Sequence, residues 1–168
     1  NGSDFTIEFD WYPITKGIHY FLKSVDSSYY AGMGVYYGLI TNKLQYQVCR
    51  GVTAQLSNFY SDIVAPSLNV WYHLKILGTR ISATSLKVEF FLDGVAVGTT
   101  TNTFTYSTAN AQHALEVAAN TNPTVISNLH ISNINRGQGS VVPSSPPVGD
   151  SNSWLILKGK PSIYDATN

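Results

Sequence analysis

An Asp-Gly pair at residues 93–94 lies between two runs of alternating apolar residues, and it constrains the fold more than any other stretch. Every second residue before the pair is apolar, ending with Phe90 and Leu92, a period that is typical of a half-buried β-strand. The pair favours a two-residue type I′ turn, because both central residues of that turn need positive φ. The sequence therefore predicts a β-hairpin with Leu92 opposite Val95. In the same register Phe90 lies opposite Val97, so that one face stays apolar.

Alternating apolar segments recur along the rest of the chain, separated by Gly, Pro, Asn and Ser clusters that are typical of turns. The candidate strands are residues 5–11, 18–25, 30–40, 44–48, 71–76, 115–119 and 125–134. No segment has the period of an amphipathic helix, and the many tyrosines and β-branched residues favour strands. The pattern predicts an all-β protein, an antiparallel β-sandwich of jelly-roll type.

Composition narrows the possible partners of the chain. Ten basic and ten acidic residues cancel, and charged residues make up only 12% of the 168. No basic patch suggests nucleic acid or an anionic membrane surface, and no apolar run is long enough to span a bilayer. Cys49 has no second cysteine with which to form an internal disulfide. A surface rich in Ser, Thr, Asn and Tyr favours an extracellular setting: secreted, on a cell surface or on a virion.

The chain divides into three parts by composition. Residues 1–135 carry the predicted strands of the sandwich. Residues 136–152 are dominated by Gly, Pro and Ser, which predicts a linker. Residues 153–168 form a final apolar segment that predicts one more strand.

Three stretches, in this order and spacing, resemble the laminin-G-like, concanavalin A-like lectin/glucanase jelly roll. They are the strand at residues 4–9 followed by Pro13, the W-x-H strand at residues 71–76, and the Asp-Gly hairpin at residues 88–98. The resemblance extends over about residues 4–135, with residues 125–134 similar to the closing strand of the family. That family usually has a further strand before the first of these stretches.

The surplus strand at the C-terminus is the candidate for that missing strand. It could add to the chain's own sheet or to the sheet edge of a neighbour, which would make it an assembly element. The predicted assembly residues are Trp154, Leu155, Ile156, Leu157, Ile163 and Tyr164.

Catalytic patterns are incomplete. Some glucanases of this class carry an E-x-D-x-x-E strand, and here Glu8 and Asp10 occupy the first two places while Pro13 occupies the third. Glycoside hydrolysis needs two suitably spaced carboxyl groups. We therefore interpret Glu8 and Asp10 as a solvated strand face and His73 as a structural residue of its strand motif. The sequence predicts no enzyme.

The resemblance implies a lectin-like module, and sugar binding needs aromatic faces together with amide or carboxylate groups. The candidate ligand-binding residues are Tyr29, Tyr30, Tyr36, Tyr37, Gln45, Gln47 and Trp71. The same aromatic residues could instead cover the second face of a sheet or form a protein interface. No cofactor is required. Calcium is the one candidate ion, with loop oxygens from Asp26, Asp62, Asn120 and Asn122.

Two functions remain open from the sequence. The first is a non-catalytic, carbohydrate-binding module for adhesion on an extracellular or virion surface protein, with a glycan as its partner. The alternative is a structural protomer of an extracellular filament or appendage, in which strand complementation by the C-terminal segment drives self-association. Neither hypothesis includes nucleic acid or a membrane as a partner.

Overall fold

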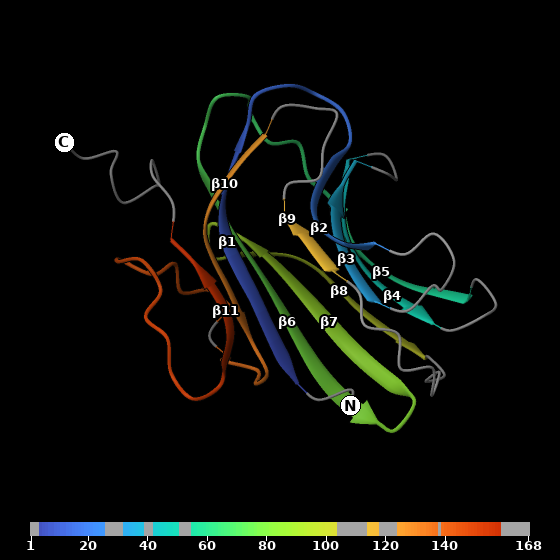
Figure 1. Cartoon of the computed structure of the whole chain (residues 1–168). Helices are drawn as coiled ribbons and strands as arrows, with labels where there is room; N and C mark the ends of the chain where they lie inside the picture. Colours follow the sequence, from blue (N-terminus) through green and yellow to red (C-terminus); the bar gives the residue numbers. More distant parts are fainter. Residues whose placement is uncertain are drawn as a thin grey trace.

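A computed structural model describes residues 4–25, 32–38, 42–50, 55–103, 114–117, 124–137 and 139–158, which form two facing antiparallel sheets (Figure 1). The six-stranded sheet has the order β11-β10-β1-β6-β7-β8, and the five-stranded sheet has the order β5-β4-β3-β2-β9. The predicted all-β antiparallel sandwich is confirmed. In these described ranges, no helix with the length and apolar character to cross a bilayer is found.

The strands of the six-stranded sheet are β1 (Phe5–Pro13), β6 (Tyr72–Ser82), β7 (Ser85–Leu92), β8 (Val95–Thr103), β10 (Thr124–Ser132) and β11 (Ser153–Leu157). The strands of the five-stranded sheet are β2 (His19–Val25), β3 (Gly32–Tyr37), β4 (Lys43–Arg50), β5 (Gln55–Ile63) and β9 (Ala114–Val117).

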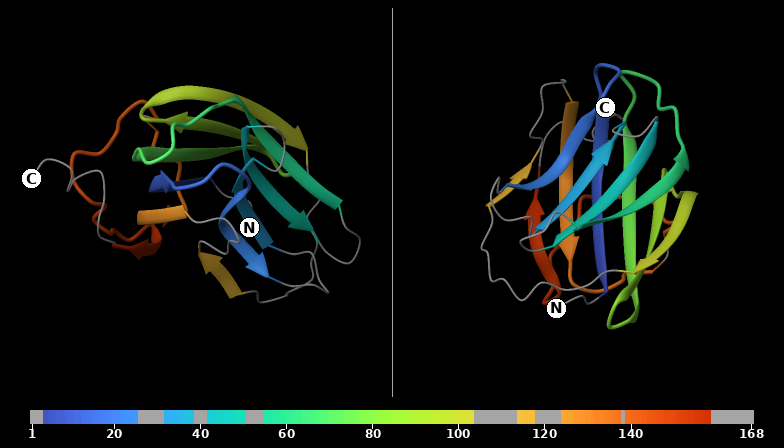
Figure 2. Two further views of the ribbon diagram at one scale, coloured as in Figure 1. Left: turned by 90° about the horizontal axis from the view of Figure 1, so that it is seen from above. Right: turned by 90° about the vertical axis from the view of Figure 1, so that its right-hand side faces the viewer.

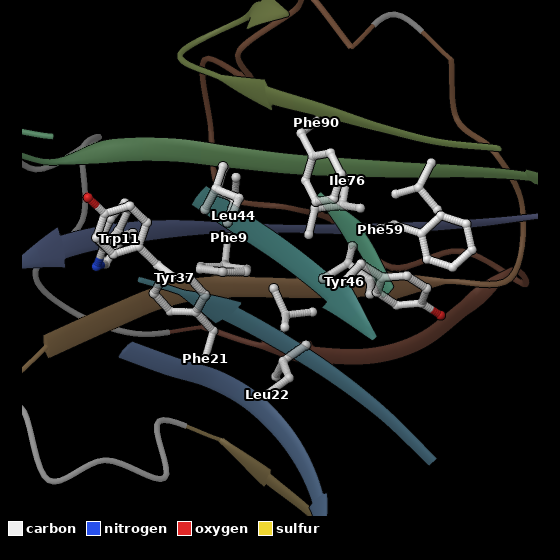
Figure 3. Packing of buried hydrophobic residues seen from close by; sticks show 14 of the residues in the cluster. Phe9, Trp11, Phe21, Leu22, Tyr37, Leu44, Tyr46, Phe59, Ile76 and Phe90 are labelled. Atoms are coloured by element: carbon white, nitrogen blue, oxygen red, sulfur yellow. The ribbon is translucent and has the colours of Figure 1, made fainter. Parts of the chain in front are cut away.

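The core lies between the two sheets, because the apolar positions of the alternating strands face inward. Phe9, Trp11, Phe21 and Phe59 are fully buried there. The Phe21 ring contacts those of Phe9 and Trp11, while Phe59 packs beside Tyr46 at the other end of the core (Figure 3). The indole Nε1 of Trp11 donates a hydrogen bond to Thr124 Oγ1, so the largest core side chain has its polar atom satisfied.

The Asp-Gly turn has the geometry that the sequence predicts. The φ values are 49° at Asp93 and 75° at Gly94, and Leu92 pairs with Val95. The predicted pairing of Phe90 with Val97 is wrong, because a bulge shifts the register and places Gly98 opposite Phe90.

The bulge has a packing reason at the edge where the two sheets meet. Gly98 has a φ of 150°, and a Cβ atom at this position would overlap the backbone of Ser61 and Asp62 in β5. Next to it, the hydroxyl of Thr100 donates to the carbonyl of Tyr60 at 2.7 Å. The glycine therefore permits the close approach of β8 to β5.

The C-terminal segment returns to the six-stranded sheet. β11 pairs antiparallel with β10 of the same chain, with Leu129 opposite Leu157 and Ile131 opposite Leu155. Residues 139–152, which we call the strap, precede β11 and lie on the side of the six-stranded sheet that faces away from the other sheet (Figures 1 and 2). Gly139 lies so close to Phe91 that a Cβ atom would overlap its ring. The stretch predicted as a linker thus lies against the sheet.

Candidate functional site

Six polar side chains lie close together on the outer face of the six-stranded sheet, beneath the strap. We call them the polar cluster: Glu8 and Asp10 of β1, His73 and Lys75 of β6, and Asn128 and His130 of β10. All six are buried, and Asp10 has no exposed surface. The interpretation of Glu8 and Asp10 as a solvated face is therefore wrong, since a segment distant in sequence covers that face.

Glu8 is the centre of the charge interactions in the cluster. Its Oε1 accepts a hydrogen bond from His130 Nδ1 at 3.0 Å, and its Oε2 lies 3.4 Å from Lys75 Nζ. His73 Nε2 lies 3.8 Å from the same Oε2, an ion-pair distance that is too long for a hydrogen bond. Burial alone would raise the pKa of Glu8, but the two histidines and Lys75 outweigh burial and lower the pKa to about 2.

Asp10 holds two neighbouring strands at once. Its Oδ1 accepts from His73 Nδ1 at 3.0 Å, and its Oδ2 accepts from Asn128 Nδ2 at 2.7 Å. Asn128 has a φ of 52°, and it lies where β10 departs from regular pairing with β1. Burial would lower the pKa of His73, but the two carboxylates raise it, which favours the charged imidazolium between Glu8 and Asp10.

A serine, a histidine and a glutamate form a hydrogen-bonded chain from β11 to β1. Ser153 Oγ lies 2.9 Å from His130 Nε2, and His130 Nδ1 lies 3.0 Å from Glu8 Oε1. These contacts match the order of a nucleophile, a base and an orienting carboxylate. However, Ser153 Oγ also lies 3.2 Å from Asp150 Oδ1 and accepts from the Asp150 N–H at 3.0 Å.

The charge of Asp150 opposes nucleophilic chemistry at Ser153. A hydrogen bond from Arg136, at 2.7 Å, and the N–H of Asn152 lower the pKa of Asp150 to about 2. A carboxylate beside Ser153 Oγ would destabilise the negative charge that an attacking serine develops. We therefore interpret these contacts as structural hydrogen bonds that hold β11 against β10 and β1.

A pocket of about 240 Å³ lies between the polar cluster and the strap, and we call it the strap pocket. Its lining comprises Glu8, His73, Asn128, His130, Arg136, Pro143, Ser145, Pro146, Pro147 and Val148. One wall is thus charged and belongs to the sheet, and the other is rich in proline and belongs to the strap. Three polar atoms of the lining have no hydrogen-bond partner: His73 Nε2, Asn128 Oδ1 and Arg136 Nε.

Three of the predicted ligand-binding residues lie together on the outer face of the five-stranded sheet. Tyr36 pairs with Gln45 across β3 and β4, and Gln47 lies two residues further along β4. The side-chain amides of Gln45 and Gln47 both donate to Asn58 Oδ1, at 3.0 and 2.9 Å. Tyr20 packs edge-on against Tyr36, with ring centroids 5.2 Å apart. We call this set, together with Tyr60 opposite Gln45, the tyrosine–amide face.

The other predicted ligand-binding residues lie elsewhere. Tyr37 points into the core, as Figure 3 shows, and its hydroxyl donates to the Val64 carbonyl at 3.2 Å. Trp71 immediately precedes β6 in the other half of the sandwich and packs on Tyr12, with ring centroids 5.1 Å apart. Tyr29 and Tyr30 are outside the described residues.

The calcium prediction has one described candidate. Asp62 is exposed on β5, while Asp26, Asn120 and Asn122 are outside the described residues. The described part of the chain holds no group of three or more His, Cys, Asp and Glu side chains that could bind a metal ion.

The four described assembly residues, Trp154 to Leu157, lie on β11 at the edge of the six-stranded sheet. Trp154 is 77% exposed and Leu157 is 44% exposed, while Leu155 packs against the core. Ile156 pairs with His130 in the β10 ladder. Ile163 and Tyr164 are outside the described residues.

Several residues of these two outer faces were missed by sequence reasoning. Asn58 and Tyr60 lie in a stretch without a regular pattern, and β5 is recognisable only by its pairing with β4. Tyr20 could have been predicted, because it precedes the core residue Phe21 in its strand and therefore faces outward. Asn128 lines the strap pocket beside an irregularity in the pairing of β10 with β1, and Arg136 lines it where the chain returns towards the strap. The sequence carries no local signal for either feature.

No protein-family model and no curated protein matches the sequence. Among solved structures, the binding domain of Botulinum Neurotoxin DC in complex with SialylT matches with a TM-score of 0.53 and 16% identity over 82% of this chain. The same binding domain in complex with rat synaptotagmin II matches with a TM-score of 0.53 and 16% identity over 81% of this chain.

A heptameric SAP-like pentraxin from Limulus polyphemus matches with a TM-score of 0.57 and 12% identity over 94% of this chain and 81% of the pentraxin. The match spans only about a third of the toxin chains, 34% and 33%. At these identities the likeness is one of fold. The predicted concanavalin A-like jelly roll is thereby confirmed.

Proposed function

We propose that this chain, which has a concanavalin A-like lectin fold, is a non-catalytic carbohydrate-binding module of an extracellular or virion surface protein. The observation that carries the proposal is the tyrosine–amide face. It gathers phenol rings and primary amides without a carboxylate among its members, on the outer surface of the five-stranded sheet.

The chemistry of this face suits neutral sugars. Sugar hydroxyls are both donors and acceptors, and the Gln47 and Asn58 amides offer both functions within one ladder. The half-buried rings of Tyr20 and Tyr60 supply apolar surface for the C–H groups of a pyranose. Tyr36 and Gln45 are buried and support the neighbouring side chains from within the face.

The solved structures of similar fold add independent support. One toxin binding domain, of which the match covers 34%, was solved in complex with SialylT. The same domain was also solved with rat synaptotagmin II, a protein partner. Fold alone therefore leaves a protein ligand as the competing possibility.

A glycan array with matched variants tests the proposal. We expect the chain to bind a subset of glycans and Asn58→Ala to weaken that binding about tenfold, because both glutamine amides lose their acceptor. The control is Asn133→Ala, an exposed asparagine in the turn after β10. An array without any signal, or equal binding by both variants, would refute the proposal.

The absence of catalysis has its own test. Ser153 is the one described serine in a contact chain of this type, and a fluorophosphonate probe labels activated serines covalently. We expect no labelling of Ser153 and no cleavage of any glycan that the array identifies. Labelling that disappears in His130→Ala would show that the chain is an enzyme.

The alternative function, a filament protomer, has one observation in its favour. β11 is the last strand of its sheet and carries Trp154 on its surface. Its hydrogen bonds go to β10 of the same chain, which favours a self-contained module. Concentration-dependent polymers in size-exclusion chromatography that vanish in Trp154→Ser would favour the alternative.

A further inference from the structure

We propose that the strap pocket is a second binding site, separate from the tyrosine–amide face, for one small neutral polyhydroxyl compound such as a monosaccharide or a polyol. The proposal combines an observed cavity with buried polar atoms that lack hydrogen-bond partners. It extends the carbohydrate-binding function to a second site but does not depend on the tyrosine–amide face.

The unpartnered atoms define the ligand chemistry. His73 and Asn128 are 4% and 3% exposed, both line the pocket, and each leaves one polar atom without a hydrogen bond. His73 Nδ1 and Asn128 Nδ2 both donate to Asp10, so the atoms left without a hydrogen bond are Asn128 Oδ1 and His73 Nε2. Oδ1 is an acceptor, and Nε2 is a donor in the imidazolium that the nearby Glu8 and Asp10 carboxylates favour. A buried polar atom without a partner is costly, and a hydroxyl group can serve both atoms at once.

The charge around the pocket favours a neutral occupant. Glu8, Asp10 and Asp150 are balanced by Lys75, Arg136 and protonated His73, and most of these groups are paired with one another. A bound anion would lie near Glu8, and a bound cation would lie near Arg136 and His73. A neutral ligand avoids both repulsions while it uses the free donors and acceptor.

The size and walls of the pocket suit one ring. A volume of 240 Å³ equals that of about eight liquid water molecules. Pro143, Pro146 and Pro147 line the strap side, and their rings offer an apolar surface for the C–H groups of a sugar or polyol. The strap forms one wall of the pocket, which lies outside the core between the two sheets.

The test uses two replacements of His73, each of which keeps the position of one ring nitrogen and removes the other. In His73→Asn the amide nitrogen takes the place of Nδ1 and preserves the bond to Asp10, while the Nε2 donor is lost. In His73→Gln the amide nitrogen takes the place of Nε2 and the bond to Asp10 is lost. The pair therefore separates ligand recognition from support of the fold.

Saturation-transfer NMR with a panel of monosaccharides and polyols at millimolar concentration gives the readout, with thermal unfolding measured in parallel. We expect at least one compound to bind, His73→Asn to weaken it about tenfold, and His73→Gln to retain affinity at a lower Tm. Asn58→Ala should leave this binding intact, which separates the pocket from the proposed glycan face. No binding by any compound, or equal loss in both histidine variants, overturns the proposal.

A second variant tests the pocket without a change to the buried polar cluster, so that a loss of binding cannot be attributed to unfolding. Ser145→Trp places a large side chain on the strap wall of the pocket without a change in the polar cluster. It should abolish binding while the Tm stays close to that of the wild type. Unchanged affinity in Ser145→Trp also overturns the proposal.

Discussion

The two outer faces of the sandwich carry polar side chains at alternate strand positions, but they differ in what covers them. The face of the six-stranded sheet holds charged groups and lies beneath the strap, so Glu8, Asp10 and Lys75 are buried. The face of the five-stranded sheet holds amides and phenols, and Gln47, Asn58 and Tyr60 remain partly exposed. Alternation therefore identifies the outward side of a strand without showing whether that side meets water.

The difference in chemistry follows from the difference in cover. Charged groups withdrawn from water must pair, and each carboxylate of the polar cluster meets at least one cationic or hydrogen-bonding partner. The neutral amides of the other face hydrogen-bond to one another, and the side chains of Gln47 and Asn58 remain partly exposed. We expect stability to depend mainly on the first face, and the proposed glycan recognition to depend on the second.

Truncation of the C-terminal segment should produce the largest loss of stability, because it removes the cover of the six-stranded sheet. Removal of residues 153–168 eliminates β11, the Ser153–His130 contact and the anchor of the strap, which exposes the polar cluster. We expect a loss on the order of 5 kcal/mol in the free energy of unfolding, from lost hydrogen bonds and apolar burial.

The matched control for that truncation ends at Lys158, because it keeps the strap and β11. Thermal unfolding should separate the two chains by many degrees. Equal Tm values for the two truncated chains would show that the C-terminal strand does not complete the sandwich.

Asp10→Ala should be the most damaging single substitution at the covered face. It leaves protonated His73 and the Asn128 amide buried without their acceptor. We expect a loss of about 4 kcal/mol in chemical denaturation. The control is Asp62→Ala, an exposed carboxylate on β5 that should cost less than about 0.5 kcal/mol. Similar costs for the two variants would contradict the burial of the cluster.

The pH dependence of stability should reveal Glu8. Its pKa is about 2 in the folded chain against 4.5 for the unfolded group, so its contribution is complete above 4.5. That contribution, roughly 3 kcal/mol, should be lost as the pH falls from 4.5 through 2. Glu8→Gln should flatten the stability profile in this window. A profile with the same slope in both chains would rule out Glu8 as the source.

The contribution of His73 to stability should be lost as the pH rises, whereas that of Glu8 is lost as the pH falls. Its pKa is raised above 6.5, so the stabilisation is complete below that pH and is lost as the pH rises through the folded-state pKa. In His73→Asn, the decline in stability on the alkaline side of 6.5 should disappear. NMR titration of the ring carbon protons would measure this pKa directly.

The smallest effect on stability is expected at the tyrosine–amide face. Gln45→Ala removes one amide donor from Asn58 and should cost about 1 kcal/mol, because Gln47 still donates to the same oxygen. Denaturant unfolding of this variant, beside Asp10→Ala, measures the contrast between the two faces. A larger loss of unfolding free energy for Gln45→Ala than for Asp10→Ala would contradict the claim that stability depends mainly on the covered face.

Local signals in the sequence were sufficient for the strands of the hairpin and for the sandwich class. Asp93 and Gly94 dictate a turn through their own φ values, and alternation assigns Phe9 and Trp11 to the core. The bulge at Gly98 escaped prediction because its cause is the approach of β5, a contact between distant segments.

The candidate sites were less predictable for the same reason. Gln45 and Gln47 could be placed on one face from their spacing, whereas Asn58 required the pairing of β5 with β4. Tyr37 was included as part of a tyrosine-rich stretch, although it and Tyr36 are adjacent strand residues and therefore point to opposite faces. The burial of Glu8 depends on the path of the strap, which no local pattern reveals.

An amide NMR titration of the isotope-labelled chain with a glycan identified on the array tests the central claim most directly. Our account predicts saturable shifts in β3, β4 and β5 around Gln47 and Asn58, with the backbone signals of β1 and β6 unchanged. Shifts confined to β10 and β11, or no saturable shift at all, would contradict the assignment of the tyrosine–amide face as the glycan-binding surface.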